Sequence, residues 1–566
     1  MDNKNVFVAI ALSMSVLLFW GAFFETPKNQ IEQKTNNQIQ EKTENSITPS
    51  ANQAPSINQL TVEKKVSRDE SINNSDRIRI ENENIIGSIS LEGGLIDDIS
   101  FKNHKQKVEG SKNIEFLNPA QTENGFYAES GWASIGNKIK VPTKNSKWKV
   151  EGNKVLTDKS PVILKWNNNE GVIFKKKIEL DEKYLFKISQ EIQNNSSQSV
   201  ELYPYAQITR NKVPDDIQNF YISHEGFIGV FDDELKEDDY DDIEDNKIVR
   251  ETNEGWLGIT DKYWMTVLVP EAGKNFKSTY QYNDSFKANY IINEPVKINA
   301  NSSGVNSLRL FVAAKEVETI DAYAENQNIK KLDLVIDWGW FYFFTKPLFF
   351  VIDYLFKFSG NFGFAIVLIT LAIRALFFPL ANFSFRSMAK MKAVTPEMQR
   401  LKELHKDDKV KLQQEMMALY RKEKINPASG CLPVLIQIPF FFAIYKMLFI
   451  SLEMRHQPFF GWIKDLSAAD PTSIFNLFGL IPWDPPSFMI IGIWPILMGA
   501  SMWVQQKLNP APADPIQAKI FAFFPLFLTI ILASFPSGLV VYWTVNNILT
   551  IAQQWVINKN TKVKTN

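Results

Sequence analysis

The hydrophobic pattern divides the chain into two parts of different kind. Between residues 77 and 316, short apolar runs alternate with polar residues and are separated by turn residues. Residues 336–557 instead hold a series of long apolar segments. Period-two alternation predicts half-buried strands, whereas a membrane-spanning helix needs ~20 mostly apolar residues. The pattern therefore predicts an all-β domain followed by a polytopic α-helical membrane region.

Six segments are long and apolar enough to suggest transmembrane helices. They are residues 6–24, 360–380, 431–450, 488–504, 520–535 and 539–557. The first is long for the apolar part of a signal peptide, and no small-x-small cleavage pair follows it. We therefore expect residues 1–24 to be an uncleaved anchor and residues 359–557 to form a five-helix core.

The region between the anchor and the core predicts a linker and a β domain. Residues 25–76 are rich in Asn, Gln, Lys, Ser and Thr, which favours a flexible linker. Residues 77–335 carry many short strand patterns, typical of a large antiparallel sandwich. Two hairpins are predicted, one pairing 162–166 with 172–178 and the other pairing 185–192 with 200–208. The acidic run 232–245 lacks the glycine of an EF-hand calcium loop and is expected to be a mobile, solvated loop.

The stretch before the core is unusually aromatic. Eleven of the 21 residues from Trp338 to Phe358 are aromatic, and Lys346, Asp353 and Lys357 lie among them. Aromatic rings interspersed with charge suit the headgroup layer of a membrane. We therefore expect residues 336–358 to form an interfacial amphipathic helix. The alternative is an ordinary buried helix of the β domain.

Loop charge predicts the orientation. Residues 386–424 carry eleven Lys or Arg, whereas residues 451–487 carry only Arg455 and Lys464. Because basic loops stay in the cytoplasm, both termini are expected there and residues 25–335 in the periplasm. Apolar residues at spacings of three and four on either side of 405–409 predict a cytoplasmic helical hairpin over 384–426, followed by a short tail, 558–566. Its basic surface suits RNA phosphates, or serves only to fix the topology.

The candidate chemistry centres on Arg374. Thr370 and Arg374 are the only residues from Phe364 to Leu380 that are not apolar. An arginine keeps its proton, and the cost at the centre of a spanning helix is ~2.5–3.5 kcal/mol, so water, a partner or a cavity must lie beside it. The predicted spans contain no Asp or Glu but do contain Gln437, Asn546 and Asn547. This combination favours a hydrated groove over a dry polar cluster or an arginine that snorkels to the interface.

Other functional classes find little support. The net charge is −1, so bulk charge indicates no nucleic-acid partner. The single cysteine, Cys431, excludes an internal disulfide, and the four histidines match no metal-ligand spacing. No common nucleotide or zinc motif occurs, so we expect neither an enzyme nor a cofactor or metal. A transporter binding an anionic solute at Arg374 and a carbohydrate-processing enzyme built on the β domain remain alternatives.

Several long motifs carry a family resemblance. They are GWLGITDKYW (255–264), GNFGFAIVLITLAIRALFFPL (360–380), SMAKM (387–391), QEMMALYRKEKINPASGCLPVLIQIPFFFAIY (414–445) and FPSGLVVYW (535–543). With the order of segments, they resemble the YidC/Oxa/Alb family of membrane-protein insertases, of the Gram-negative type with a large periplasmic domain. The resemblance implies a chaperone and insertase of inner-membrane proteins, working alone or with the Sec translocon, and a β-supersandwich fold for the outer domain.

The resemblance also implies a lateral groove and a set of partners. Its groove would be lined by Thr370, Arg374, Gln437, Tyr542 and Trp543. We add Asn546, a polar residue in the same predicted span as Tyr542 and Trp543. The partners would be nascent membrane proteins, the ribosome, the signal recognition particle and its receptor, the Sec translocon and membrane lipids. Two features depart from the family pattern. One is an extra segment at 472–486, which has no assigned role, and the other is a tail of only nine residues, through which we do not expect the ribosome to dock.

Overall fold

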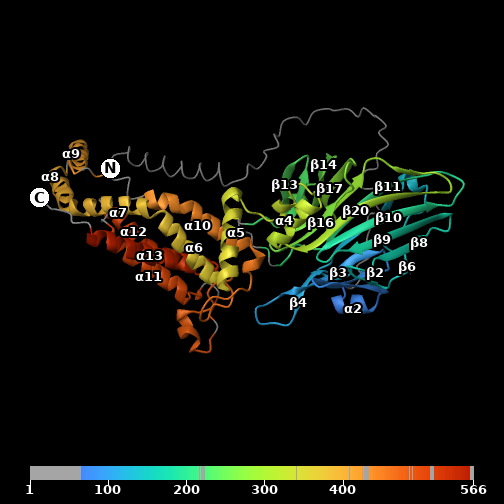
Figure 1. Ribbon diagram of the computed structural model, residues 1–566, viewed down its shortest axis with the longest axis horizontal. Coiled ribbons are helices and arrows are strands. Elements are labelled where there is room, and N and C mark those ends of the chain that lie inside the picture. Colours follow the sequence, from blue (N-terminus) through green and yellow to red (C-terminus); the bar gives the residue numbers. More distant parts are fainter. Residues whose placement is uncertain are drawn as a thin grey trace. The chain divides into compact units, whose positions relative to one another are not determined.

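A computed structural model describes residues 65–215, 217, 223–339, 341–406, 408–423, 425, 432–483, 485–486, 489–509 and 515–560 (Figure 1). The predicted anchor, most of the predicted linker, the end of the predicted hairpin, Cys431 and most of the tail lie outside these residues. The described chain forms a β domain followed by a helical region.

Two sheets make up the β domain and pack face to face around a common apolar core, as the alternating pattern predicts. All strand pairs are antiparallel except β1 with β7. The 11-stranded sheet consists of β1 (Arg77–Glu81), β2 (Ile85–Ser90), β3 (Leu95–Lys105), β4 (Asn113–Leu117), β5 (Phe126–Ala133), β7 (Val155–Leu156), β11 (Val200–Arg210), β14 (Ile248–Thr252), β17 (Phe276–Tyr282), β18 (Phe286–Ile292) and β19 (Val296–Ile298). The 9-stranded sheet consists of β6 (Lys149–Glu151), β8 (Val162–Asn167), β9 (Val172–Leu180), β10 (Leu185–Asn194), β12 (Gly226–Phe231), β13 (Glu234–Asp238), β15 (Gly255–Thr260), β16 (Trp264–Val269) and β20 (Ser302–Ala314).

One predicted hairpin is confirmed and the other is wrong. β8 pairs with β9, as predicted for 162–178. β10 and β11 lie in different sheets, because β10 pairs with β9 on one side and β20 on the other. The side chain of Asn194 stabilises this crossing, since its Nδ2 donates to the carbonyl of Gln198 at 2.7 Å and to that of Ile298 at 3.2 Å. A turn signal between two strands therefore marked a passage between sheets.

Two segments expected to be flexible are ordered. Helix α2 (Arg68–Asn73) lies at the end of the predicted linker, and Arg68 forms ion pairs with Asp98 and Glu115 of the sheet. The acidic run forms β13 and helix α3 (Tyr240–Asp245). Its order has a physical cause: Tyr240 and Ile243, three residues apart, are both buried. The prediction of a mobile acidic loop is wrong.

Ten α-helices follow β20 in the described part of the chain. They are α4 (Val317–Asn326), α5 (Tyr342–Ser359), α6 (Phe362–Leu376), α7 (Phe378–Ala393), α8 (Thr395–Leu404), α9 (Lys409–Lys422), α10 (Leu432–Ile450), α11 (Ile493–Leu508), α12 (Pro515–Leu532) and α13 (Ser537–Asn560). By length and composition, no single helix among the described residues qualifies as a membrane span. The bent pair of α6 and α7 qualifies together, and residues 437–450 and 518–532 are shorter apolar helices.

The segment 360–380, predicted as one helix, is broken. α6 ends at Leu376, and α7 leaves it at an angle of 68°. Pro379 explains the break, because it has no N–H to donate to the carbonyl four residues earlier and its ring disfavours continuation of the helix. Phe377 takes φ −91° and ψ 10° at the junction. The break places Arg374 in the last turn of α6, next to the bend.

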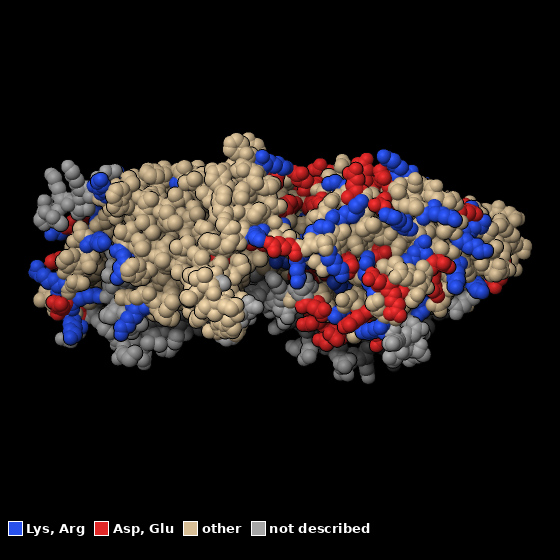
Figure 2. All heavy atoms as spheres, turned by 90° about the horizontal axis from the view of Figure 1, so that it is seen from below, with Lys and Arg blue, Asp and Glu red and all other residues tan. Residues whose placement is uncertain are grey.

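Helices α8 and α9 lie within the basic segment, residues 386–424. The break between them agrees with the interruption predicted at 405–409. The hydroxyl of Tyr420 on α9 reaches the sulfur of Met398 on α8 at 4.0 Å. Thr395 begins α8 but does not cap it, since its hydroxyl donates back to the carbonyl of Met391 at 3.1 Å. Figure 2 shows Lys and Arg gathered at the end of the helical region that carries these helices.

Candidate functional site

Helix α6 places Arg374 at the end of its buried stripe. Asn361 caps the helix by accepting the N–H of Phe364 at 2.9 Å. From there Phe362, Ile366 and Thr370 follow at intervals of four and are buried. Arg374 continues the same stripe by one more turn. The hydrophobic face that docks α6 against its neighbours therefore carries the guanidinium inward with it.

The guanidinium is held by neutral amides from two other helices. Its Nε donates to the side-chain oxygen of Asn546 on α13 at 2.8 Å, and Nη2 donates to the same oxygen at 2.5 Å. Nη2 also lies 3.2 Å from Oε1 of Gln437 on α10 and 3.4 Å from the backbone oxygen of Asn546. These partners orient the guanidinium without neutralising its charge.

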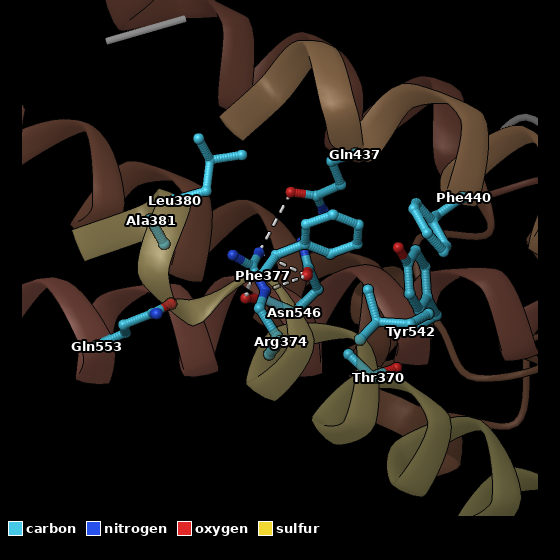
Figure 3. Close-up of a pocket in the computed structure, with 11 residues that line it drawn as sticks. Thr370, Arg374, Phe377, Leu380, Ala381, Gln437, Phe440, Tyr542, Asn546 and Gln553 are labelled. Carbon is cyan, nitrogen blue, oxygen red and sulfur yellow. Dashed lines mark hydrogen bonds between the residues drawn. The ribbon is translucent and has the colours of Figure 1, made fainter. Parts of the chain in front are cut away.

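A pocket opens beside Arg374 (Figure 3). Its lining alternates polar and apolar groups from α6, α7, α10 and α13. The lining residues are Thr370, Ile373, Arg374, Phe377, Leu380, Ala381, Gln437, Phe440, Tyr542, Asn546 and Gln553. Figure 3 shows the second terminal nitrogen of Arg374 directed toward the side where Leu380 and Ala381 lie. The pocket thus presents a donor of the guanidinium to whatever occupies it.

The electrostatics of this pocket follow from its composition. None of the described residues that line it is acidic. A buried charge without a counter-ion is stable only where hydrogen bonds and water or a ligand solvate it. The arrangement suits transient binding of carboxylates or peptide carbonyls, since both accept hydrogen bonds from a guanidinium.

The structure brings together five of the six candidate residues. Thr370, Arg374, Gln437, Tyr542 and Asn546 all line the pocket. The Thr370 hydroxyl donates to the carbonyl of Ile366 at 2.6 Å, so its own hydrogen is already engaged.

Trp543 and Asn547 lie elsewhere. The ring of Trp543 packs edge-on against Phe441, with ring centroids 4.8 Å apart. The side chain of Asn547 donates to the hydroxyl of Ser501 on α11 at 3.0 Å. Each follows a pocket-lining residue by one position, and a step of one residue turns a side chain about 100° around a helix.

Sequence reasoning missed Gln553 and the apolar lining. Gln553 lies seven residues after Asn546, which is two turns and therefore the same face of α13. Neither side-chain atom of its amide has a hydrogen-bond partner among the described residues. The i+7 spacing from Asn546 was the available signal. Leu380 and Ala381 had none, because they join the pocket only through the bend after α6.

Comparisons with known proteins place the chain in a family. A family model described as YidC periplasmic domain matches residues 77–351, and one described as 60Kd inner membrane protein matches residues 354–565. A membrane protein insertase YidC of Pelagibacter ubique (strain HTCC1062) is 53% identical over 570 residues, covering 100% of both chains. One of Methylorubrum extorquens (strain PA1) is 44% identical and covers 100% of this chain and 96% of the relative. The chain belongs to the YidC family of membrane protein insertases, an inner membrane protein family.

Two solved structures show weaker similarity. A crystal structure of an active YidC insertase with its first transmembrane domain resolved is 18% identical, covers 84% of this chain and 91% of that one, and has a TM-score of 0.35. A galactose mutarotase related enzyme of Lactobacillus acidophilus is 14% identical, covers 42% of this chain and 97% of that one, and has a TM-score of 0.32. Neither similarity bears on the pocket around Arg374.

Proposed function

We propose that this chain inserts other membrane proteins into the inner membrane, as its family membership implies, through the pocket around Arg374. The observation that carries the route is the pairing of Arg374. Its guanidinium is fixed by Asn546 and Gln437, both neutral, beside a pocket whose described lining contains no acidic residue. The charge is therefore oriented but still available to a substrate.

The mechanism follows from this arrangement. A polar flank of the substrate enters the pocket, where Arg374 offers hydrogen bonds to its carboxylates and peptide carbonyls. The adjoining apolar segment leaves sideways into lipid, and its burial contributes ~25 cal/mol per Å² of apolar surface. The pocket lowers the barrier because the polar flank crosses only part of the membrane without solvation.

The proposal includes the expected organisation in the membrane. Residues 1–24 anchor the chain, 25–76 link it to the periplasmic domain at 77–335, and 336–358 lie at the interface. Residues 359–557 form the five-helix core with a cytoplasmic hairpin at 384–426, followed by the tail at 558–566. The basic loop charge supports this orientation. The ribosome, the signal recognition particle and its receptor, and the Sec translocon are the partners proposed for this arrangement.

Site-specific photocrosslinking tests the route. A photoreactive amino acid at Phe440, which lines the pocket, is compared with one at Trp503 on α11, which is 53% exposed and outside the pocket. Ribosome-arrested nascent membrane proteins are expected to crosslink strongly to position 440 and weakly to position 503. A substrate that reached the membrane through the surrounding lipid would crosslink to both positions.

Equal crosslinking at the two positions, or reaction at 503 alone, contradicts the pocket route. Solute flux in proteoliposomes distinguishes the transporter alternative. If the chain is an insertase, substitution of Arg374 should not change the flux of small anions.

A further inference from the structure

The extra segment in the loop between α10 and α11 forms an exposed apolar loop. This apolar loop, residues 472–483, contains no charged residue. Seven of its large apolar side chains are between 37% and 83% exposed: Ile474, Phe475, Leu477, Phe478, Leu480, Ile481 and Trp483. It lies below α11 in Figure 1 and belongs to the uncharged surface of the helical region in Figure 2. A contiguous exposed apolar surface of this kind marks an interaction site.

The base of the loop is tied to the start of α11. Asp470, which is 1% exposed, accepts the N–H of Trp494 at 2.9 Å and the N–H of Thr472 at 3.0 Å. The hydroxyl of Thr472 accepts the N–H of Ile493 at 3.0 Å, and that of Ser473 donates to the carbonyl of Met489 at 3.0 Å. These bonds satisfy N–H groups at the start of α11 and fix the loop to it.

The tip of the loop has a defined conformation. Leu477 and Phe478 have φ of 50° and 59°, the left-handed region that residues other than glycine rarely occupy. The N–H of Phe478 donates to the carbonyl of Ser473 at 2.8 Å, and that of Ile481 donates to the carbonyl of Asn476 at 3.0 Å. Backbone strain of this kind is common at functional sites, which makes the turn a candidate for a role outside the fold.

We propose that the apolar loop inserts into the lipid leaflet at the end of α10 opposite the basic segment. Exposed apolar side chains follow on α11, where Leu497 and Val504, seven residues apart on one face of the helix, are 45% and 40% exposed. Lipid that covers this face of α11 would lie next to the loop, because the base of the loop is bonded to the start of that helix. Phenylalanine and tryptophan suit the boundary between headgroups and acyl chains. Between Asp470 and Asp484 the loop carries no charge with which to select a charged partner surface.

The insertion gives this chain a second contact with the membrane surface besides its helices. Because Asp470 ties the loop to the start of α11, the loop sets the depth of that helix end. The proposal goes beyond the insertase function, since it concerns how the core is held in the bilayer and not what passes through the pocket.

Fluorescence quenching in vesicles tests the proposal. The full chain, with Cys431→Ser, carries one cysteine at Leu480 (83% exposed) labelled with an environment-sensitive dye. The control is a cysteine at Val305, an apolar residue of the β domain that is 56% exposed. In vesicles of phosphatidylethanolamine and phosphatidylglycerol, spin labels on the acyl chains are expected to quench the dye at 480 at least about twofold more than the dye at 305. Aqueous iodide is expected to show the opposite order.

Two results would overturn the proposal. Equal iodide quenching at 480 and 305, without acyl-chain quenching, would place the loop in water. Protection of 480 from both quenchers would show that protein covers it, with a second copy of the chain as the available occupant. A second label at Leu477 (53% exposed) repeats the measurement independently of the first substitution.

Discussion

Arg210 in the β domain and Arg374 in the helical region are both largely buried, but their partners differ in kind. Arg210 forms a two-point ion pair with Asp261, with nitrogen–oxygen distances of 2.5 Å and 3.2 Å. It also lies over the ring of Phe126 at 4.5 Å. Arg374 instead donates to the side-chain oxygens of two neutral amides, those of Asn546 and Gln437. The first arginine is neutralised by its own domain, and the second is only held in place.

The pKa of Arg210 reflects its pairing. Burial lowers the pKa of this guanidinium, but the Asp261 carboxylate and the Tyr240 hydroxyl outweigh that effect and raise it above its usual value. The difference between the two arginines indicates different roles. A cation that its fold neutralises contributes to structure, whereas a cation left with neutral acceptors is available to an incoming chain.

Breaking the structural pair is expected to have the largest effect. Arg210→Ala leaves Asp261 without its partner, and loss of one member of a buried pair costs on the order of 3 kcal/mol or more. Urea unfolding of the full chain, followed by tryptophan fluorescence, should show this loss, while insertion activity of the folded protein stays unchanged.

Arg79→Ala is the matched control, because Arg79 is 59% exposed in its pair with Glu81. An exposed pair contributes only about 0–1 kcal/mol. Equal destabilisation by the two substitutions would contradict a special structural role for Arg210.

Removing the available cation is expected to affect activity instead of stability. A hydrogen bond to a charged group contributes ~1.5–3 kcal/mol, so Arg374→Ala should slow insertion about ten- to a hundredfold. The midpoint of unfolding should not fall, because a charge without a counter-ion is removed from the interior. Arg374→Lys should keep part of the activity, since it restores charge but not the planar fork. If Arg374→Ala lowered the stability but left insertion at the wild-type rate, Arg374 would be a structural residue like Arg210.

A buried acid with one partner gives a third case. Oε1 of Glu453, in the loop after α10, accepts the N–H of Val317 at 2.7 Å, while Oε2 has no hydrogen-bond partner among the described residues. Burial raises the pKa of this carboxyl to about 7. Because the folded state holds the proton more tightly than the unfolded state, this contribution to stability is complete below about pH 4.5 and is lost as pH rises toward 7.

The measurement is the difference between two pH profiles of unfolding. The wild type should lose roughly 2–3 kcal/mol relative to Glu453→Gln between pH 4.5 and 7. Parallel profiles would show that Glu453 ionises freely, and that burial of an acid at this site has no energetic consequence.

The smallest expected effect comes from the amide that orients Arg374. Asn546→Leu removes the acceptor of Nε, which should slow insertion by a factor equivalent to ~0.5–1.5 kcal/mol. Combined with Arg374→Ala it should add little, because both changes remove the same interaction. Asn547→Leu is the control: its partner is Ser501, so its effect should add to that of Arg374→Ala. If the effects of Asn546→Leu and Arg374→Ala on the insertion rate were additive, Asn546 would not act through Arg374.

The division of the chain into two regions and part of the candidate site could be predicted from the sequence, but the pairing of Arg210 could not. The boundary between the β domain and the helical region follows from hydrophobic period, and Arg374, Gln437 and Asn546 follow from the rarity of polar residues in apolar segments. Their mutual contact could not be derived from the residues alone, because it depends on the rotation of three helices. Trp543 shows this limit, since one residue after Tyr542 it turns toward Phe441.

The remaining differences arise from non-local packing. The strand of 185–192 was expected to pair with that of 200–208. It forms β10, which instead pairs with β20, more than a hundred residues further along the chain. The bend at Phe377 could have been predicted from Pro379. It was not, because the whole of 360–380 is apolar enough to suggest a single spanning helix. The acidic run folds because Tyr240 and Ile243 find a core that local composition does not reveal.

We expect water to reach the pocket around Arg374 while the lipid-facing side of the same helix stays dry. Phe377 lines the pocket, and its neighbour Leu376 is 71% exposed outside the pocket. In a Cys431→Ser background, a cysteine at 377 should react with a membrane-impermeant maleimide added from the side of the basic loop, and a cysteine at 376 should not. A cysteine at 377 that reacts only after denaturation would contradict the account.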